Sequence, residues 1–102
     1  MMIRCNIYFP YSEGARFDFD YYINTHLPKN LEKLPGIVLE VSAEHGLSAP
    51  GGRPPVHIAI GHLRITSIVE YMSAFGTVAG ELGADVPNFT DITGASMEFT
   101  QY

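Results

Sequence analysis

Two kinds of periodicity alternate along this chain of 102 residues and restrict the folds that it can adopt. Four segments place apolar side chains at every second position, which is the pattern of β-strands with two different faces. Two segments between them repeat apolar residues at the helical spacing of three or four. The predicted strands are 2–9, 37–44, 56–65 and 95–102, and the predicted helices are 18–34 and 67–82.

This order, β-α-β-β-α-β, is the ferredoxin-like pattern, an α+β sandwich in which an antiparallel sheet carries both helices on one face. The length predicts one domain that spans residues 1–102. The other face of the sheet has no covering layer within such a chain, and several strands offer apolar residues on both sides. We therefore expect a homodimer through the open sheet face.

The predicted first helix contains a proline in its interior. Asp18 is a suitable N-cap, and the apolar residues of 23–34 share one face of the helix. His26 lies beside that face, four residues after Tyr22. Pro28 should break or kink the helix near His26, because proline lacks the N–H of a regular helical turn. A loosened turn beside a histidine is a natural pocket wall.

The second helix has clearer ends. Ser67 and Glu70 form a capping-box pattern that predicts its start, and Gly83 is a suitable C-terminal stop. The residues predicted to form its apolar stripe are Ile68, Met72, Phe75, Ala79 and Leu82.

Two segments resemble signatures of the EthD family, which is named for a component of an ethyl tert-butyl ether degradation pathway. Tyrosines precede a spaced His-x-Pro in the first segment, and the second runs from Asp85 to Asp91 as Asp-Val-Pro-Asn-Phe-Thr-Asp. The matching residues of the first are Phe17, Tyr21, Tyr22, His26 and Pro28. The resemblance covers nearly the whole chain and implies a dimeric α/β barrel, in which two ferredoxin-like subunits join.

His26 is the leading candidate for a catalytic residue, because imidazole donates or accepts a proton near neutral pH. The other interpretation is a helical histidine that is hydrogen-bonded to backbone freed by Pro28. The residues alone support both, and the resemblance to the EthD family favours the functional one. Tyr22 is the candidate to orient His26 or a substrate, although aromatic residues on a helix are more often packing residues.

Two further residues are candidates for substrate binding. His57 and His62 are five positions apart on one strand, so we expect them on opposite faces, with His57 toward the helices and the cavity of His26. Asn88 offers a polar contact to the same cavity, although a turn-stabilising role is the preferred interpretation for the 85–91 segment.

Composition excludes several classes of function. The net charge of −5 and the lack of a basic cluster argue against nucleic-acid or membrane partners. Cys5 is the only cysteine, which excludes an intrachain disulfide and fits a buried thiol in the cytoplasm. We expect no metal and no bound cofactor, because neither zinc spacing nor a phosphate-binding or dinucleotide-binding signature is present.

The functional prediction is a cofactor-independent enzyme of oxygenase, isomerase or cyclase type. It uses His26 as acid/base on a small apolar or aromatic substrate, with one site per subunit. The alternative is a non-catalytic protein that binds a small ligand or serves as an accessory to a degradation pathway.

Overall fold

The computed structural model covers residues 1–102, and it has the predicted order of strands and helices. All neighbouring strands are antiparallel, in the sheet order β2-β3-β1-β4. The strands are β1 (Ile3–Pro10), β2 (Val38–His45), β3 (His57–Ile65) and β4 (Ser96–Gln101). This arrangement is the ferredoxin-like fold that the sequence predicts.

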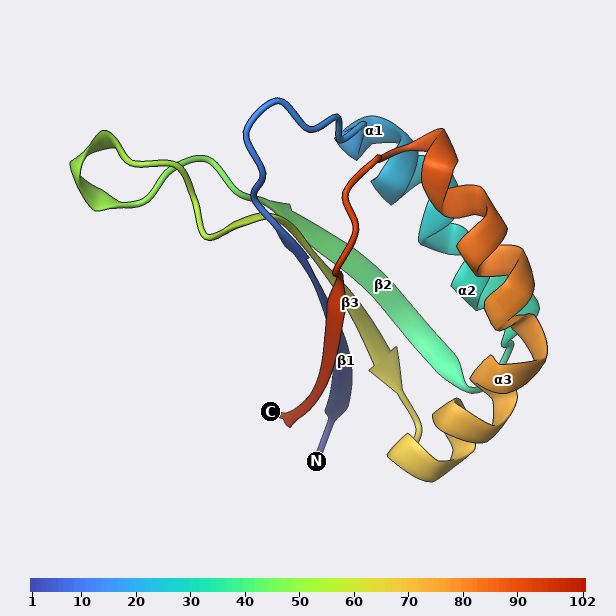
Figure 1. The fold of residues 1–102 in the computed structure, drawn as a ribbon. Coiled ribbons are helices and arrows are strands. Elements are labelled where there is room, and N and C mark those ends of the chain that lie inside the picture. The colour runs from blue at the N-terminus through green and yellow to red at the C-terminus, as the bar shows by residue number, and fades with distance from the viewer.

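The helices lie together on one face of the sheet, and the other face has no covering layer (Figure 1). They are α1 (Phe19–Tyr21), α2 (Pro28–Lys33) and α3 (Ile68–Asp85). Alternate residues of β1, among them Cys5 and Phe9, point toward the helices and form the core with Leu27 and Tyr71. Cys5 is fully buried, as expected of a structural thiol.

The helical run from 19 to 33 changes its pitch in the middle. A π-helical turn, η1 (Tyr22–His26), separates α1 from α2, and the N–H of Leu27 donates to the carbonyl of Tyr22 at 2.9 Å. Pro28 follows at the first position of α2. A regular turn would press the Pro28 ring against the carbonyl four residues earlier, and the wider π-turn relieves that contact. The predicted break near His26 is therefore a widened turn.

The helix α3 differs from its prediction at one end and in its buried face. Ser67 Oγ accepts the N–H of Glu70 at 3.1 Å, which confirms the capping box. The predicted stop at Gly83 is wrong, because the helix continues to Asp85 and passes into the 3₁₀ turn η3 (Val86–Asn88). The predicted stripe is rotated, since Ile68 and Met72 are exposed. The buried positions of the helix are Tyr71, Leu82 and Asp85.

The uncovered face of the sheet carries hydrogen bonds that cross all four strands. Glu44 Oε1 lies 2.5 Å from His62 Nε2, and His62 Nδ1 lies 2.7 Å from Asn6 Oδ1. The Asn6 amide donates to Thr100 Oγ1 at 2.7 Å. Asn6 is only 3% exposed. This face is therefore more polar than the sequence pattern predicts.

The Gly/Pro-rich segment 46–56 projects away from the sheet on the side opposite the helices (Figure 1). It contains the short 3₁₀ turn η2 (Pro50–Gly52). Among the helices of the chain, none has the length and apolar character needed to cross a membrane.

Candidate functional site

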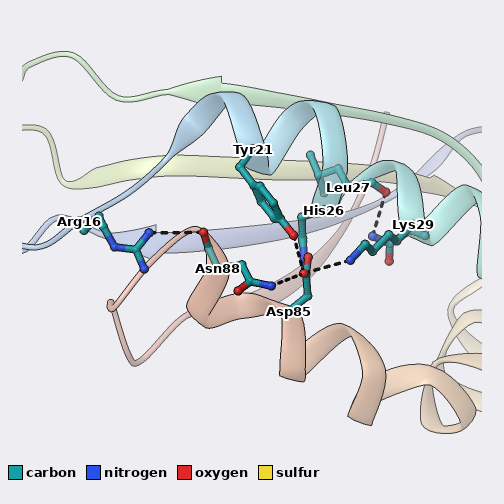
Figure 2. A network of polar contacts seen from close by, with 8 residues as sticks. Arg16, Tyr21, His26, Leu27, Lys29, Asp85 and Asn88 are labelled. Atoms are coloured by element: carbon teal, nitrogen blue, oxygen red, sulfur yellow. Dashed lines mark hydrogen bonds and ion pairs between the residues drawn. The ribbon is translucent and has the colours of Figure 1, made fainter.

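The carboxylate of Asp85 is the centre of a buried polar network between the helical run 19–33 and the C-terminal end of α3 (Figure 2). Its Oδ2 lies 2.8 Å from His26 Nδ1. Its Oδ1 accepts from the Tyr21 hydroxyl at 2.7 Å and from Asn88 Nδ2 at 2.9 Å, and it lies 3.0 Å from Lys29 Nζ. The Asp85 side chain is 7% exposed. Four donors thus surround one carboxylate that has little access to water.

The two signature segments are brought together by backbone pairing. Phe17 and Thr90 form an antiparallel bridge, and the N–H of Asp18 donates to the carbonyl of Phe89 at 2.7 Å. The Arg16 guanidinium donates to the carbonyl of Pro87 at 2.6 Å, and the same side chain reaches the carbonyl of Asn88 (Figure 2). These contacts hold the end of α3 against η1.

The network determines the tautomer and the protonation state of the His26 imidazole. An ionised carboxylate only accepts hydrogen bonds, so Nδ1 of His26 carries the proton and Nε2 carries a lone pair. Burial lowers the pKa of His26 below its ordinary value of 6.5, and the hydrogen bond with Asp85 only partly opposes this effect. His26 is therefore a neutral imidazole at pH 7.

At Asp85 the balance is reversed: its hydrogen bonds outweigh its burial, and the carboxyl group is ionised. Burial by itself raises the pKa of Asp85, but the hydrogen bonds from Tyr21, Asn88, His26 and Lys29 outweigh burial and hold that pKa well below its usual range. The result is a fixed negative charge behind a neutral histidine, which is the arrangement that supports an imidazole as it gains a proton.

His26 lies in the wall of an apolar cavity of about 270 Å³. Eleven of the fifteen lining residues are hydrophobic, and they come from the sheet, η1, α3, η3 and the segment that leads into β4. The lining includes Ile7, Phe9, Tyr22, Tyr71 and Phe75. A larger and more open hollow of about 550 Å³ lies between residues 10–15 and 91–93, and His26 does not line it. The smaller cavity is the candidate site, because it alone contains an acid/base group shielded from water.

Some of the predicted site residues line the cavity and others lie outside it. Tyr22 lines the cavity, and its ring stacks on His26 with a centroid separation of 5.7 Å. Asn88 does not line the cavity, and its amide holds Asp85 instead. Thr90 is also structural, because its hydroxyl donates to the carbonyl of Arg16 at 2.6 Å.

His57 does not lie with His26 as expected. Its ring packs on Tyr8, with a centroid separation of 5.0 Å, and it does not line the cavity. Tyr8 and Asn6 share one face of β1, so His57 and His62 contact the same side of the sheet and not opposite sides. The pairing of β1 with β3 shifts register between Phe9 and Pro10, beside His57, and simple alternation fails there.

Sequence reasoning missed Asp85 as the partner of His26, and it missed Lys29 and Tyr21 as donors to that carboxylate. A signal for Asp85 existed, because it follows Leu82 by three residues and so continues the buried stripe of α3. The expected end at Gly83 concealed that signal. No three histidine, cysteine or acidic side chains come together as potential metal ligands.

The fold and the site together define the class of protein: a ferredoxin-like α+β protein with a buried histidine–aspartate pair beside an apolar cavity. No family model and no curated protein matches the chain. An EthD-like protein from Ralstonia eutropha has 31% identity, with 98% of this chain and 90% of that chain covered and a TM-score of 0.90. The chain belongs to the EthD-like family.

Two more distant structures share the fold. An ethyl tert-butyl ether degradation (EthD) family protein from Bacillus halodurans has 18% identity and a TM-score of 0.69, with coverage of 100% of this chain and 99% of that one. HapK from Hahella chejuensis has 16% identity and a TM-score of 0.54, with coverage of 97% and 92%.

Proposed function

We propose that this protein is a cofactor-independent enzyme in which His26 moves a proton on a small apolar or aromatic substrate. The observation that carries the proposal is the position of His26. It has one nitrogen bound to a buried carboxylate, and its ring lies in the wall of an apolar cavity. An imidazole held in this way is a general base of the kind that enzymes place in water-poor sites.

The reaction begins at Nε2, because Asp85 already occupies Nδ1. The lone pair of Nε2 removes a proton from the substrate, and His26 becomes an imidazolium. Asp85 stabilises that charge without taking the proton, since its own pKa is held low. The imidazolium then returns the proton to another atom of the substrate, which is the sequence of an isomerase or cyclase.

Lys29, Tyr21 and Asn88 act as positioning residues in this proposal. They bind Oδ1 of Asp85 and leave Oδ2 to His26. Their hydrogen bonds keep the carboxylate ionised and fix its orientation, as the outer partners of a catalytic histidine commonly do.

The working unit in this proposal is a cytoplasmic homodimer of single-domain subunits, joined through the open sheet face. Only one face of the sheet carries helices (Figure 1). On the other face Asn6 is only 3% exposed, although no layer of this chain covers it. Sedimentation velocity of the wild type and of His62→Glu, which adds negative charge beside Glu44, tests this part. The variant should be monomeric at concentrations where the wild type is dimeric.

The proton transfer is tested by hydrogen–deuterium exchange at carbon. Small phenols, quinones, lactones and aliphatic ketones are first screened by thermal shift, because a bound ligand raises the unfolding midpoint. Those with acidic C–H groups are then followed by proton NMR in D₂O. We expect the wild type to catalyse exchange and His26→Gln to lose about 10²-fold or more of that rate.

His45→Gln is the matched control, because His45 is an exposed histidine that stacks on Phe19 outside the cavity. It should exchange protons at the wild-type rate. Ligand-induced thermal shifts that survive His26→Gln, with no exchange by any variant, would instead establish the alternative function. The protein would then be a non-catalytic ligand-binding or accessory member of its family.

A further inference from the structure

Asn30 is a buried polar residue of the cavity wall that the proposed proton transfer does not use. It belongs to α2, is 4% exposed and lies four positions after His26. Residues four apart on a helix are neighbours on one face, and both of these line the cavity. Apart from two tyrosines, they are the only lining residues with polar side chains.

The two tyrosine hydroxyls do not offer hydrogen bonds to the cavity. The hydroxyl of Tyr22 is packed against Gly61, and that of Tyr71 is beside the thiol of Cys5. Both oxygens are fully enclosed, and neither Gly61 nor Cys5 lines the cavity. The polar side chains that a ligand meets in the cavity are therefore the histidine and the asparagine.

The one hydrogen bond of the Asn30 side chain fixes the orientation of its amide. Nδ2 donates to the carbonyl of Leu27 at 3.1 Å, so Oδ1 lies on the other side of the group and has no partner in the protein. The tyrosine hydroxyls are the only fully enclosed side-chain polar atoms without a partner, so Oδ1 keeps accessible surface. The cavity is the one hollow that Asn30 lines. Oδ1 is therefore a hydrogen-bond acceptor open to a ligand there.

The Asn30 amide is not needed to complete the helix. The carbonyl of Leu27 already accepts the backbone N–H of Asn30 at 3.0 Å. A leucine at position 30 would have nearly the same size and would suit the apolar surroundings better, because a buried amide oxygen without a hydrogen bond is unfavourable. The partner of Oδ1 therefore comes from outside the chain.

We infer that Asn30 selects the substrate by accepting a hydrogen bond from its hydroxyl group, and that the substrate is a mainly apolar alcohol or phenol. This inference rests on the proposed function of His26 and names its substrate class. A carbonyl oxygen would face two acceptors, Asn30 Oδ1 and the lone pair of His26 Nε2, whereas a hydroxyl group has a proton to donate. The remaining lining is largely hydrophobic and suits the hydrocarbon part of such a molecule.

The compounds p-cresol and p-xylene test the hydroxyl site. They have nearly the same shape, but the hydroxyl group of the first is replaced in the second by a methyl group, which donates no hydrogen bond. Affinity for each is measured by NMR titration of the wild type and of Asn30→Leu. We expect the affinity ratio of p-cresol to p-xylene to fall about fivefold in the variant, because one hydrogen bond is lost.

Asn24→Leu is the matched control, because Asn24 is an exposed residue of the same helical run and does not line the cavity. It should keep the wild-type affinity ratio. Asn30→Ala removes the amide without adding bulk, and it gives the same comparison if the leucine variant does not fold. An unchanged ratio in a folded Asn30 variant would show that Oδ1 only binds water and would overturn the inference. Failure of p-cresol to bind the wild type at millimolar concentration would also overturn it.

The carbon-exchange measurement with His26→Gln separates the two proposals. Loss of exchange in this variant with a retained preference for p-cresol supports both the base and the hydroxyl site. A wild type that shows no exchange, but whose preference for p-cresol is lost in Asn30→Leu, contradicts only the proposed function of His26. Exchange by a wild type whose preference does not depend on Asn30 overturns only the hydroxyl site.

Discussion

His26 and Asp85 are 59 positions apart in the sequence, yet His26 Nδ1 and Asp85 Oδ2 are only 2.8 Å apart. The contact depends on one feature of each of the two helical segments that carry these residues. The π-turn that ends at His26 widens the helix before Pro28, and α3 continues two residues beyond Gly83 to place Asp85 at its end. Each side chain belongs to one of the two segments that resemble the family signatures, so this contact is where the two signatures meet.

Asp85→Asn should lower the pKa of His26 further. In the wild type, burial and the Lys29 charge lower this pKa and Asp85 raises it, so without the carboxylate both remaining effects favour the neutral ring. The titration of the His26 ring protons by NMR measures the change. Asp20→Asn is a control for the loss of an exposed carboxylate, and it should leave the His26 titration as in the wild type. An equal shift in both variants would mean that general charge, and not the hydrogen bond, acts on His26.

Lys29→Met should change the same pKa in the opposite direction. The Lys29 ammonium ion, 3.0 Å from Asp85 Oδ1, opposes a positive charge on His26 and thereby lowers its pKa. The methionine side chain has a similar length and no charge, so the pKa of His26 should rise. NMR titration beside the Asp85→Asn variant checks the two signs. Shifts of the same sign in both variants would contradict the assignment of the network.

Acid should lower the free energy of unfolding of this protein in two separate pH ranges. The pKa of folded His26 lies below 6.5, so the unfolded chain takes up a proton first and stability falls as the pH drops below 6.5. The pKa of folded Asp85 lies below its ordinary 3.8, so its contribution is complete above about pH 4 and is lost as the pH falls further.

Urea unfolding between pH 8 and pH 2.5 measures both stages. His26→Gln should lack the first decline, and Asp85→Asn should lack the second. Because Asp85→Asn also leaves buried donors poorly matched, its unfolding free energy at pH 7 should be lower by about 1–3 kcal/mol. A wild-type curve that is flat between pH 7 and pH 5 would exclude a depressed His26 pKa.

Gly61→Ala should destabilise the protein, and Tyr22→Phe should relieve part of the effect. An alanine Cβ at position 61 would lie 2.0 Å from the Tyr22 hydroxyl but 3.1 Å from the ring carbon that bears it. The hydroxyl clash should cost about 1–3 kcal/mol of unfolding free energy. A double-mutant cycle in urea measures the coupling. Additive effects of the two substitutions would show that Tyr22 moves away from Gly61 at no cost.

Local patterns predicted the order of the elements, the N-caps Asp18 and Ser67 and the loosened turn before Pro28. These features depend on residues a few positions apart, so the sequence contains the necessary information. The face of His57 was predicted incorrectly, because the register shift between β1 and β3 beside His57 overrides simple alternation. The buried stripe of α3 was also rotated, since the fit of the helix to the sheet decides which of its apolar residues are covered.

The sequence by itself determined the fold class, the position of the one helical histidine beside a proline and the family signatures, since all of these are read from periodicity and residue identity. Only the tertiary structure decided that Asp85 binds His26 and that His26, Tyr22 and Tyr71 line one cavity. The reason is physical. Hydrogen bonding, burial and the pKa shifts that follow depend on which distant side chains share a water-poor space, and chain packing alone settles that choice.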